Sequence, residues 1–179
     1  TGFAIVKMDP EKDEVRDTYY PTNGTKAIVD VVFANDSIYA LTEDEMYRGS
    51  VNNQALADPA QWTLDTRVTP AAYPFSDIEF AANELFVLSK SSQFSGDTVY
   101  QVTNSGLQVA VVESFVMEIN SISTVEDRLL VDYSGGGRIY NSNWTLYENL
   151  GLFNGALANP MGTVYDGSTY WIADKNNGL

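Results

Sequence analysis

The feature of this chain that most limits its fold is a motif that occurs four times. Each copy has two short runs rich in β-branched and aromatic residues, separated by a tight polar turn, and this pattern predicts a β-hairpin. The four copies are Ile28–Leu41, Pro74–Leu88, Ile119–Asp132 and Asn159–Ile172. The turns predicted within them lie at Asn35-Asp36, Ala82-Asn83, Glu126-Asp127 and Asp166-Gly167.

The second half of the unit repeats as well. Met46-Tyr47, Val99-Tyr100 and Ile139-Tyr140 each begin a third apolar run, and a polar turn and a fourth run follow each of them. Four short strands repeated in tandem are the sequence signature of a β-propeller blade. A generic antiparallel meander or sandwich also has evenly spaced strands, but it has no reason to repeat the same four-strand phrase.

The spacing of the copies agrees with blades. The equivalent anchors Asp30, Asp77, Ser121 and Met161 are 47, 44 and 40 residues apart, within the length of known blade repeats. The expected fold is an all-β propeller of four-stranded antiparallel blades, with almost no helix. The expected divisions are strands 3 and 4 of a first blade at 1–27, blades at 28–73, 74–118 and 119–158, and half a blade at 159–179.

Composition excludes several classes of function. The chain has 179 residues, 44% of them hydrophobic, so it can bury a core. It contains neither Cys nor His, which removes thiol nucleophiles, Ser-His-Asp triads, disulfides and zinc sites built on thiolate or imidazole. The formal net charge of −14 repels nucleic acid. We therefore expect no nucleic-acid partner and no cofactor.

The predicted binding surface is the face on which the loops between second and third strands meet the connections between blades. These loops are polar, rich in Gly and Asn, and carry aromatic residues including Phe75 and Phe153. Aromatic rings beside amides and carboxylates suit sugars, whose C–H faces stack while their hydroxyls need polar partners. The candidate ligand-binding residues are Tyr73, Phe94, Asp97, Tyr133, Arg138, Lys175, Asn176 and Asn177. The alternative is that the Asn and Gly serve the turns and the aromatics fill the core.

Two groups of carboxylates could carry other chemistry. Glu43, Asp44 and Glu45 could hold Ca²⁺, although no calcium-loop motif is present and adjacent acids on a loop are commonly just solvated. Asp30 and Asp77 lie on predicted innermost strands and could act as a glycosidase pair. Because the carboxylate is not repeated at the later anchors, we favour hydrogen bonds to neighbouring blades. We predict no catalytic residues and no metal site.

The last residues carry a family resemblance. Trp171-Ile172 and Gly178-Leu179, within Tyr170–Leu179, resemble the W-I-G-T-x-x-G-L phrase of two-component regulator propeller repeats, common in surface proteins of the Bacteroidetes. Ala173-Asp174 replace the Gly-Thr of that phrase, and two Asn precede the glycine. This version is most similar to the N-terminal propellers of PorZ-type proteins of the type IX secretion system. The phrase is strong in this copy only.

The resemblance implies an exported, non-catalytic binding or scaffold module at the cell surface, outer membrane or periplasm. Its implied partners are glycan, such as lipopolysaccharide, and other secretion or surface proteins. The same repeat builds sensor domains of hybrid two-component receptors for polysaccharide fragments, which is the alternative function. A propeller glycoside hydrolase is a third.

The two ends of the chain fall at the same phase of the repeat. Gly2-Phe3 and Gly178-Leu179 both sit at the start of a third strand, four repeats apart. A closed four-bladed ring, with the ends sharing one blade, would explain this. We favour a window on a larger ring, because the chain stops at the start of a strand.

Overall fold

The protein is described by a computed structural model that covers residues 2–7, 14–92, 96–112, 118–150 and 160–174. Its sheets are all antiparallel, and three of them have four strands in the order in which the strands occur along the chain. One 3₁₀ turn, Pro59–Gln61, interrupts the strands. The predicted propeller of four-stranded antiparallel blades is confirmed.

The blades are named here by their strands. Blade 1 contains β3 (Asp30–Ala34), β4 (Ser37–Leu41), β5 (Met46–Ser50) and β6 (Thr63–Leu64). Blade 2 contains β7 (Phe75–Ala81), β8 (Glu84–Ser89), β9 (Thr98–Thr103) and β10 (Gly106–Val112). Blade 3 contains β11 (Ile119–Val125), β12 (Arg128–Tyr133), β13 (Gly136–Tyr140) and β14 (Leu146–Asn149). Two hairpins flank them, β1 (Phe3–Lys7) with β2 (Glu14–Tyr19), and β15 (Pro160–Tyr165) with β16 (Tyr170–Asp174).

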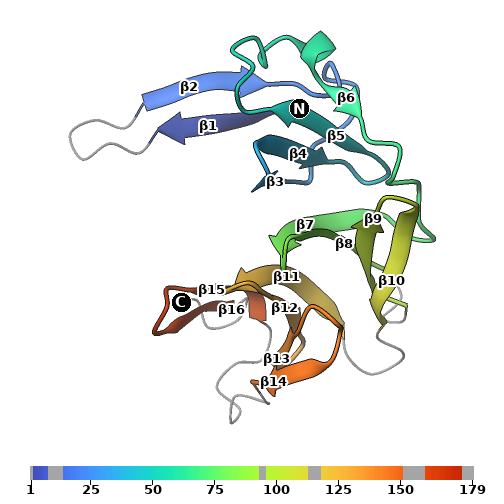
Figure 1. Ribbon diagram of the computed structural model, residues 1–179, viewed down its shortest axis with the longest axis vertical. Helices are drawn as coiled ribbons and strands as arrows, with labels where there is room; N and C mark the ends of the chain where they lie inside the picture. The colour runs from blue at the N-terminus through green and yellow to red at the C-terminus, as the bar shows by residue number, and fades with distance from the viewer. Residues whose placement is uncertain (1, 8–13, 93–95, 113–117, 151–159, 175–179) are drawn as a thin grey trace.

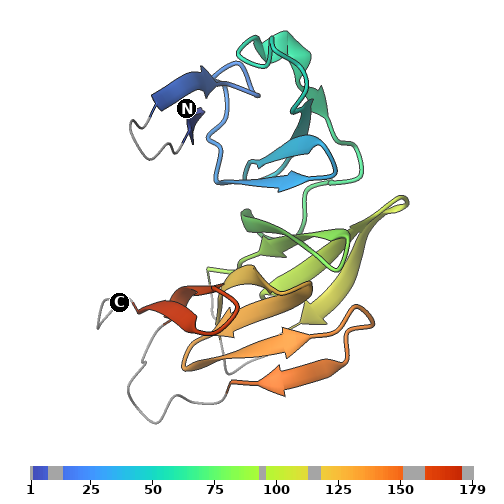
Figure 2. The same ribbon diagram turned by 60° about the vertical axis from the view of Figure 1, so that its left-hand side comes forward.

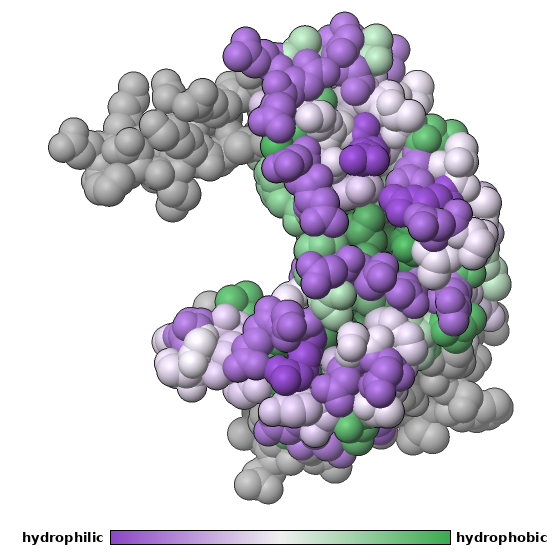
Figure 3. All heavy atoms as spheres, viewed as in Figure 1, coloured by the Kyte–Doolittle hydropathy of each residue, from purple (hydrophilic) through white to green (hydrophobic). Residues whose placement is uncertain are grey.

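The sheets follow one another along an arc (Figure 1). The first strands β3, β7 and β11 lie toward its concave side, and the outer strands β6, β10 and β14 lie on its convex side. The two flanking hairpins form separate sheets and remain apart in both ribbon views (Figure 2). The space-filling view shows the same arc with its open side to the left (Figure 3). Within the described ranges, no helix has the length and apolar character needed to cross a membrane.

The repeated turns have the backbone that a tight hairpin requires. Asn35 and Asp36 both have positive φ, 47° and 59°, and Ala82 and Asn83 have 51° and 62°. Two successive residues with positive φ match the right-handed twist of the flanking strands. The predicted turn positions in blades 1 and 2 are therefore confirmed, even at Ala82, whose side chain disfavours this conformation.

The fourth hairpin differs from its predicted alignment by one residue. Tyr165 pairs with Tyr170, so four residues form the loop instead of two. The Asp166 carboxylate stabilises this longer loop by accepting hydrogen bonds from the backbone N–H of Ser168 and Thr169. As a result Gly162, and not Met161 as predicted, takes the place that Ser121 has in blade 3.

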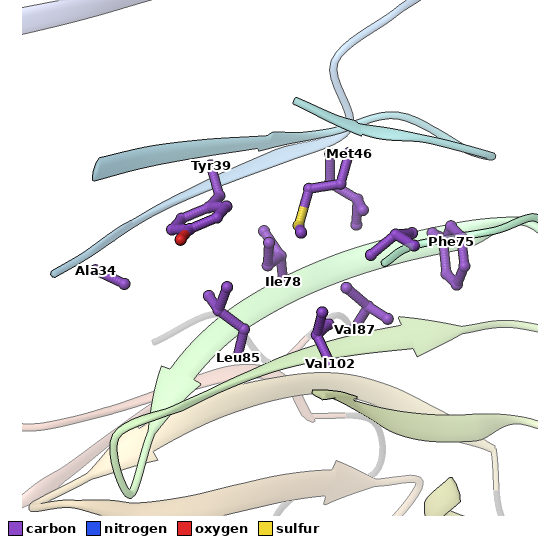
Figure 4. Packing of buried hydrophobic residues seen from close by; sticks show 10 residues of the cluster. Ala34, Tyr39, Met46, Phe75, Ile78, Leu85, Val87 and Val102 are labelled. Atoms are coloured by element: carbon purple, nitrogen blue, oxygen red, sulfur yellow. The ribbon is translucent and has the colours of Figure 1, made fainter. Parts of the chain in front are cut away.

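Each blade contributes to two separate cores because side chains alternate across a strand. In β8, Leu85 and Val87 pack toward blade 1, whereas Phe86 and Leu88 pack toward blade 3. Figure 4 shows the first of these cores, with Tyr39 and Met46 of blade 1 above the side chains of blade 2. Burial at these seams between blades positions the loops on the two rims of the arc.

One polar group in the seam after blade 3 is buried without a partner. The Ser123 hydroxyl has no hydrogen bond in the part of the chain that the structure describes. The neighbouring Thr124 hydroxyl donates to the Phe80 carbonyl oxygen at 2.8 Å and so links blades 2 and 3. An unpaired buried hydroxyl costs free energy, whereas a paired one stabilises the fold.

We therefore expect Ser123→Ala to leave the free energy of unfolding unchanged or to raise it by up to about 1 kcal/mol. Thr124→Ala is the matched control, and we expect it to lower that free energy by about 1 kcal/mol. Urea unfolding of both variants measures the difference. A loss of stability in Ser123→Ala equal to that in Thr124→Ala would contradict the assignment.

Candidate functional site

The carboxylates of the innermost strands join neighbouring blades. Asp30 accepts a hydrogen bond from the backbone N–H of Ile78 at 2.9 Å, and Asp77 accepts one from Ile122 at 2.8 Å. The other oxygen of Asp30 accepts from the N–H of Val31. The favoured interpretation of these two anchors, hydrogen bonding between blades, is confirmed.

In blade 3 the carboxylate moves to the second strand. Ser121 replaces Asp at the anchor, and its cross-strand partner Asp132 supplies the acid instead. Asp132 accepts hydrogen bonds from the hydroxyls of Ser121 at 3.0 Å and Thr163 at 2.9 Å, so it joins blade 3 to β15. Sequence reasoning missed Asp132, although its cross-strand register with Ser121 was a usable signal.

These buried acids bind protons more tightly than ordinary carboxylates. Burial raises the pKa of Asp132 to about 6, although the hydrogen bonds from Thr163 and Ser121 act in the opposite direction. Burial, followed by a hydrogen bond with Asp30, raises the pKa of Asp77 well above its usual range. The hydrogen bonds of these acids connect neighbouring blades, and each oxygen of Asp30 already accepts one from a backbone N–H.

Several predicted ligand-binding residues serve the fold instead. Asp97 is 2% exposed, and its two oxygens accept from the N–H groups of Ser91 and Ile119. Tyr133 is also 2% exposed, and its hydroxyl lies 3.0 Å from that of Tyr140. Phe75, predicted on the same face, is buried in a core. Asp97 and Tyr133 therefore do not line an open surface, whereas buried Phe75 closes the inner end of a hollow described below.

The remaining predicted residues have different outcomes. The Arg138 guanidinium lies 4.7 Å from the centre of the Tyr133 ring, a cation–π contact within the blade. Tyr73 is 37% exposed. Four predicted site residues fall outside the described residues, namely Phe94, Lys175, Asn176 and Asn177.

Tyr73 stands between two adjoining hollows at the seam of blades 1 and 2, on the predicted loop face. We call them together the Tyr73 cleft. Their volumes are about 540 and 460 Å³, and they share Glu43, Tyr73 and Pro74. The first is lined by Lys26, Ala27, Thr42, Glu43, Asp44 and Pro70–Pro74. The second is lined by Val29, Glu43, Tyr73–Ser76 and Lys90–Ser92.

The local sequence holds Tyr73 in place. Its carbonyl oxygen accepts a hydrogen bond from the Ser89 hydroxyl at 2.8 Å, which fixes the connection between blades to the end of β8. Gly96 lies beside the ring, and a Cβ at that position would come 3.1 Å from a ring carbon. Gly96 also has a φ of +91°, which disfavours any side chain. The tyrosine ring is thus fixed from the backbone side while part of it faces solvent.

The charges beside the cleft are partly neutralised. The Lys26 ammonium lies 2.7 Å from an oxygen of Asp44 and 2.9 Å from one of Glu45. Hydrogen bonds with Asp44 and then Glu45 raise the pKa of Lys26, and the same contact with Lys26 lowers that of Asp44. Two of the three adjacent acids considered for Ca²⁺ therefore already have a cation. Glu43 is exposed and forms no ion pair with a described residue.

Comparison with known proteins gives a match to one family model and likenesses among solved structures. Residues 1–63 match the family model described as the PorZ N-terminal β-propeller domain of the type IX secretion system. Among solved structures, the WD40 domain of Neurospora crassa Pan2 is similar, with 11% sequence identity and a TM-score of 0.44. That match covers 84% of this chain, which spans half of the solved chain. No curated protein sequence matches. The predicted resemblance to PorZ-type N-terminal β-propellers is thereby confirmed, and it rests on residues 1–63.

Proposed function

We propose that this chain is a non-catalytic binding module of the bacterial cell envelope, which contacts glycan and partner proteins as part of a secretion apparatus. The family match over residues 1–63 supports the envelope setting. The use of Asp30 and Asp77 as links between blades supports a role without catalysis. The Tyr73 cleft is the proposed glycan site.

The observation that carries the glycan site is the fixed, partly exposed ring of Tyr73 between two hollows. A sugar ring stacks its C–H face on such an aromatic, and the tyrosine loses little conformational freedom on binding because it is already positioned. Glu43, Lys90 and Ser92 surround it with groups that bond to hydroxyls. The volume of each hollow is in the usual range for ligand sites.

The charge of the Tyr73 cleft indicates which part of lipopolysaccharide would bind there. Because Asp44 and Glu45 neutralise Lys26, exposed Glu43 leaves a negative balance at the first hollow. Phosphate groups would be repelled there, and the whole chain carries −14. The proposed ligand is therefore the uncharged polysaccharide portion of lipopolysaccharide, and not its phosphorylated lipid end.

The test measures binding of purified lipopolysaccharide and of its polysaccharide portion after removal of the lipid, by isothermal titration calorimetry. We expect both to bind and Tyr73→Ala to weaken binding on the order of tenfold, since an aromatic contact contributes up to about 1.5 kcal/mol. Tyr147→Ala is the matched control, because Tyr147 is 55% exposed on β14, away from the cleft. Absence of binding, or equal loss in both variants, overturns the site.

A further inference from the structure

A second cleft lies at the seam of blades 1 and 2, on the opposite face of the arc. It has a volume of about 790 Å³ and shares no residue with the Tyr73 cleft. Its lining comes from the β3–β4 turn, strands β4, β5 and β6, the loop between β5 and β6, the link to blade 2, and the β9–β10 turn. We call it the Arg48 cleft, and its lining is Asn35–Ser37, Tyr39, Arg48, Ser50, Asn53, Gln61, Thr63–Arg67 and Asn104.

The cleft is built across blade 1. Tyr39, Arg48 and Thr63 are direct cross-strand neighbours on β4, β5 and β6. Tyr39 is buried, and the Arg48 guanidinium carbon lies 5.7 Å from the centre of its ring. Arg67 pairs with Asp65 at 2.6 Å. The strand register thus places the Arg48 guanidinium over the buried ring of Tyr39.

Two arginines line the cleft, and Arg48 is the one that forms no ion pair with a described residue. Lys26, Arg67, Lys90 and Arg128 each form an ion pair, whereas Arg48 forms none with any residue that the structure describes. Its Nε donates to the Ser37 hydroxyl at 2.9 Å. The two terminal nitrogens have no hydrogen bond to the described residues, and the side chain is exposed. A guanidinium held through Nε and lying over an aromatic ring can bind a planar anion with both terminal nitrogens.

The other lining groups narrow the ligand class. Two arginines face two aspartates, Asp36 and Asp65, so the lining is neutral overall. A singly charged carboxylate fits this balance, whereas a phosphate of nearly two charges would meet greater repulsion from the aspartates. The remaining lining is rich in amides and hydroxyls, such as Gln61, Thr63 and Asn104, which both donate to and accept from sugar hydroxyls.

We propose that the Arg48 cleft binds a saccharide that contains a uronic acid. Arg48 holds the sugar carboxylate through its two terminal nitrogens, and the amide and hydroxyl side chains of the lining hold the ring hydroxyls. This inference does not depend on the Tyr73 cleft.

The experiment uses the methyl glycoside of galacturonic acid, which carries one carboxylate, together with its methyl ester and inorganic phosphate as three separate ligands, with affinity measured by isothermal titration calorimetry. We expect the acid to bind, and the ester, which lacks the charge, and phosphate to bind at least about tenfold more weakly. Arg48→Gln should weaken binding of the acid by about tenfold or more, and Arg48→Lys by less, because lysine keeps the charge but loses the planar fork. Arg128→Gln is the matched control, since Arg128 also lies over a tyrosine ring, that of Tyr147.

Three results would overturn the proposal. They are no binding of the acid to the wild-type protein, equal binding of the acid and its methyl ester, and an equal loss in Arg48→Gln and Arg128→Gln. Circular dichroism of Arg48→Gln excludes unfolding as the cause of a loss. The glycoside and polygalacturonic acid are compared last, to distinguish a small soluble ligand from a polymer.

Discussion

Replacing Asp97 by Ala should lower the free energy of unfolding by about 2 to 6 kcal/mol. The Asp97 carboxylate is 2% exposed and accepts hydrogen bonds from two backbone N–H groups, those of Ser91 at 2.8 Å and Ile119 at 2.9 Å. Each buried donor left without a partner costs about 1 to 3 kcal/mol. The contact also joins the loop before β9 to the first strand of blade 3, so its loss weakens the seam.

Two variants make this prediction specific. Asp97→Asn keeps one acceptor oxygen, and we expect it to lose about half as much free energy as Asp97→Ala. Asp127→Ala removes an exposed acid from a hairpin turn and should change stability by less than about 0.5 kcal/mol. Urea unfolding monitored by tryptophan fluorescence measures all three. The structural role is rejected if Asp97→Ala is as stable as Asp127→Ala.

The second large effect is a loss of stability as the pH rises above about 4. Burial raises the pKa of Asp132 to about 6 and that of Asp77 well above its usual range, so the folded protein binds these protons more tightly than the unfolded chain does. Their contribution is complete below the ordinary aspartate pKa and declines as pH passes through the folded value. For Asp132, a difference of about two pH units corresponds to about 3 kcal/mol.

Other carboxylates lower the stability of the protein when the pH falls below about 4. Ion pairs with Arg67 and Lys26 lower the pKa values of Asp65 and Asp44, although burial raises that of Asp65, so their stabilisation is lost in acid. We therefore expect maximal stability near pH 4 and a decline from there to about pH 8. The midpoint of urea unfolding at a series of pH values, at constant ionic strength, measures it.

The Asn variants separate the buried acids from the charge of the whole chain. Asp77→Asn and Asp132→Asn resemble the protonated forms, because an amide still accepts one hydrogen bond and donates another. The double variant should be more stable than wild type at pH 7.5 and should lose most of the slope between pH 5 and 8. If the slope of the double variant equals that of wild type, general charge repulsion, and not these residues, causes the dependence.

The repeat was readable from the sequence because it depends on local chemistry. A turn such as Asn35-Asp36 accepts positive φ, and the flanking β-branched and aromatic residues alternate across a strand, so hairpin positions follow from adjacent residues. The same reasoning gave the wrong register at the fourth hairpin. There the Asp166 side chain stabilises a four-residue loop, and the pattern of residue types does not determine the length of the loop.

The binding sites were less predictable, because burial depends on the neighbouring blade. Asp97 and Tyr133 have residue types suited to ligands, yet both are enclosed by the fold. Arg48 is a single arginine in a predicted strand, and nothing in the sequence around it indicated a binding site. Its proposed role comes from the strand register that places it over Tyr39, and from the absence of an ion pair between Arg48 and any described residue.

By itself, the sequence determined the four-strand blade, the positions of its turns in blades 1 and 2, and the resemblance to PorZ-type propellers, since these depend on the order of residues along the chain. The tertiary structure decided which polar side chains link blades and which face open clefts. Both outcomes use the same residue types. What separates them is whether a neighbouring blade excludes water from the side chain, and that is set by contacts between residues more than 40 positions apart, such as Asp30 with Ile78.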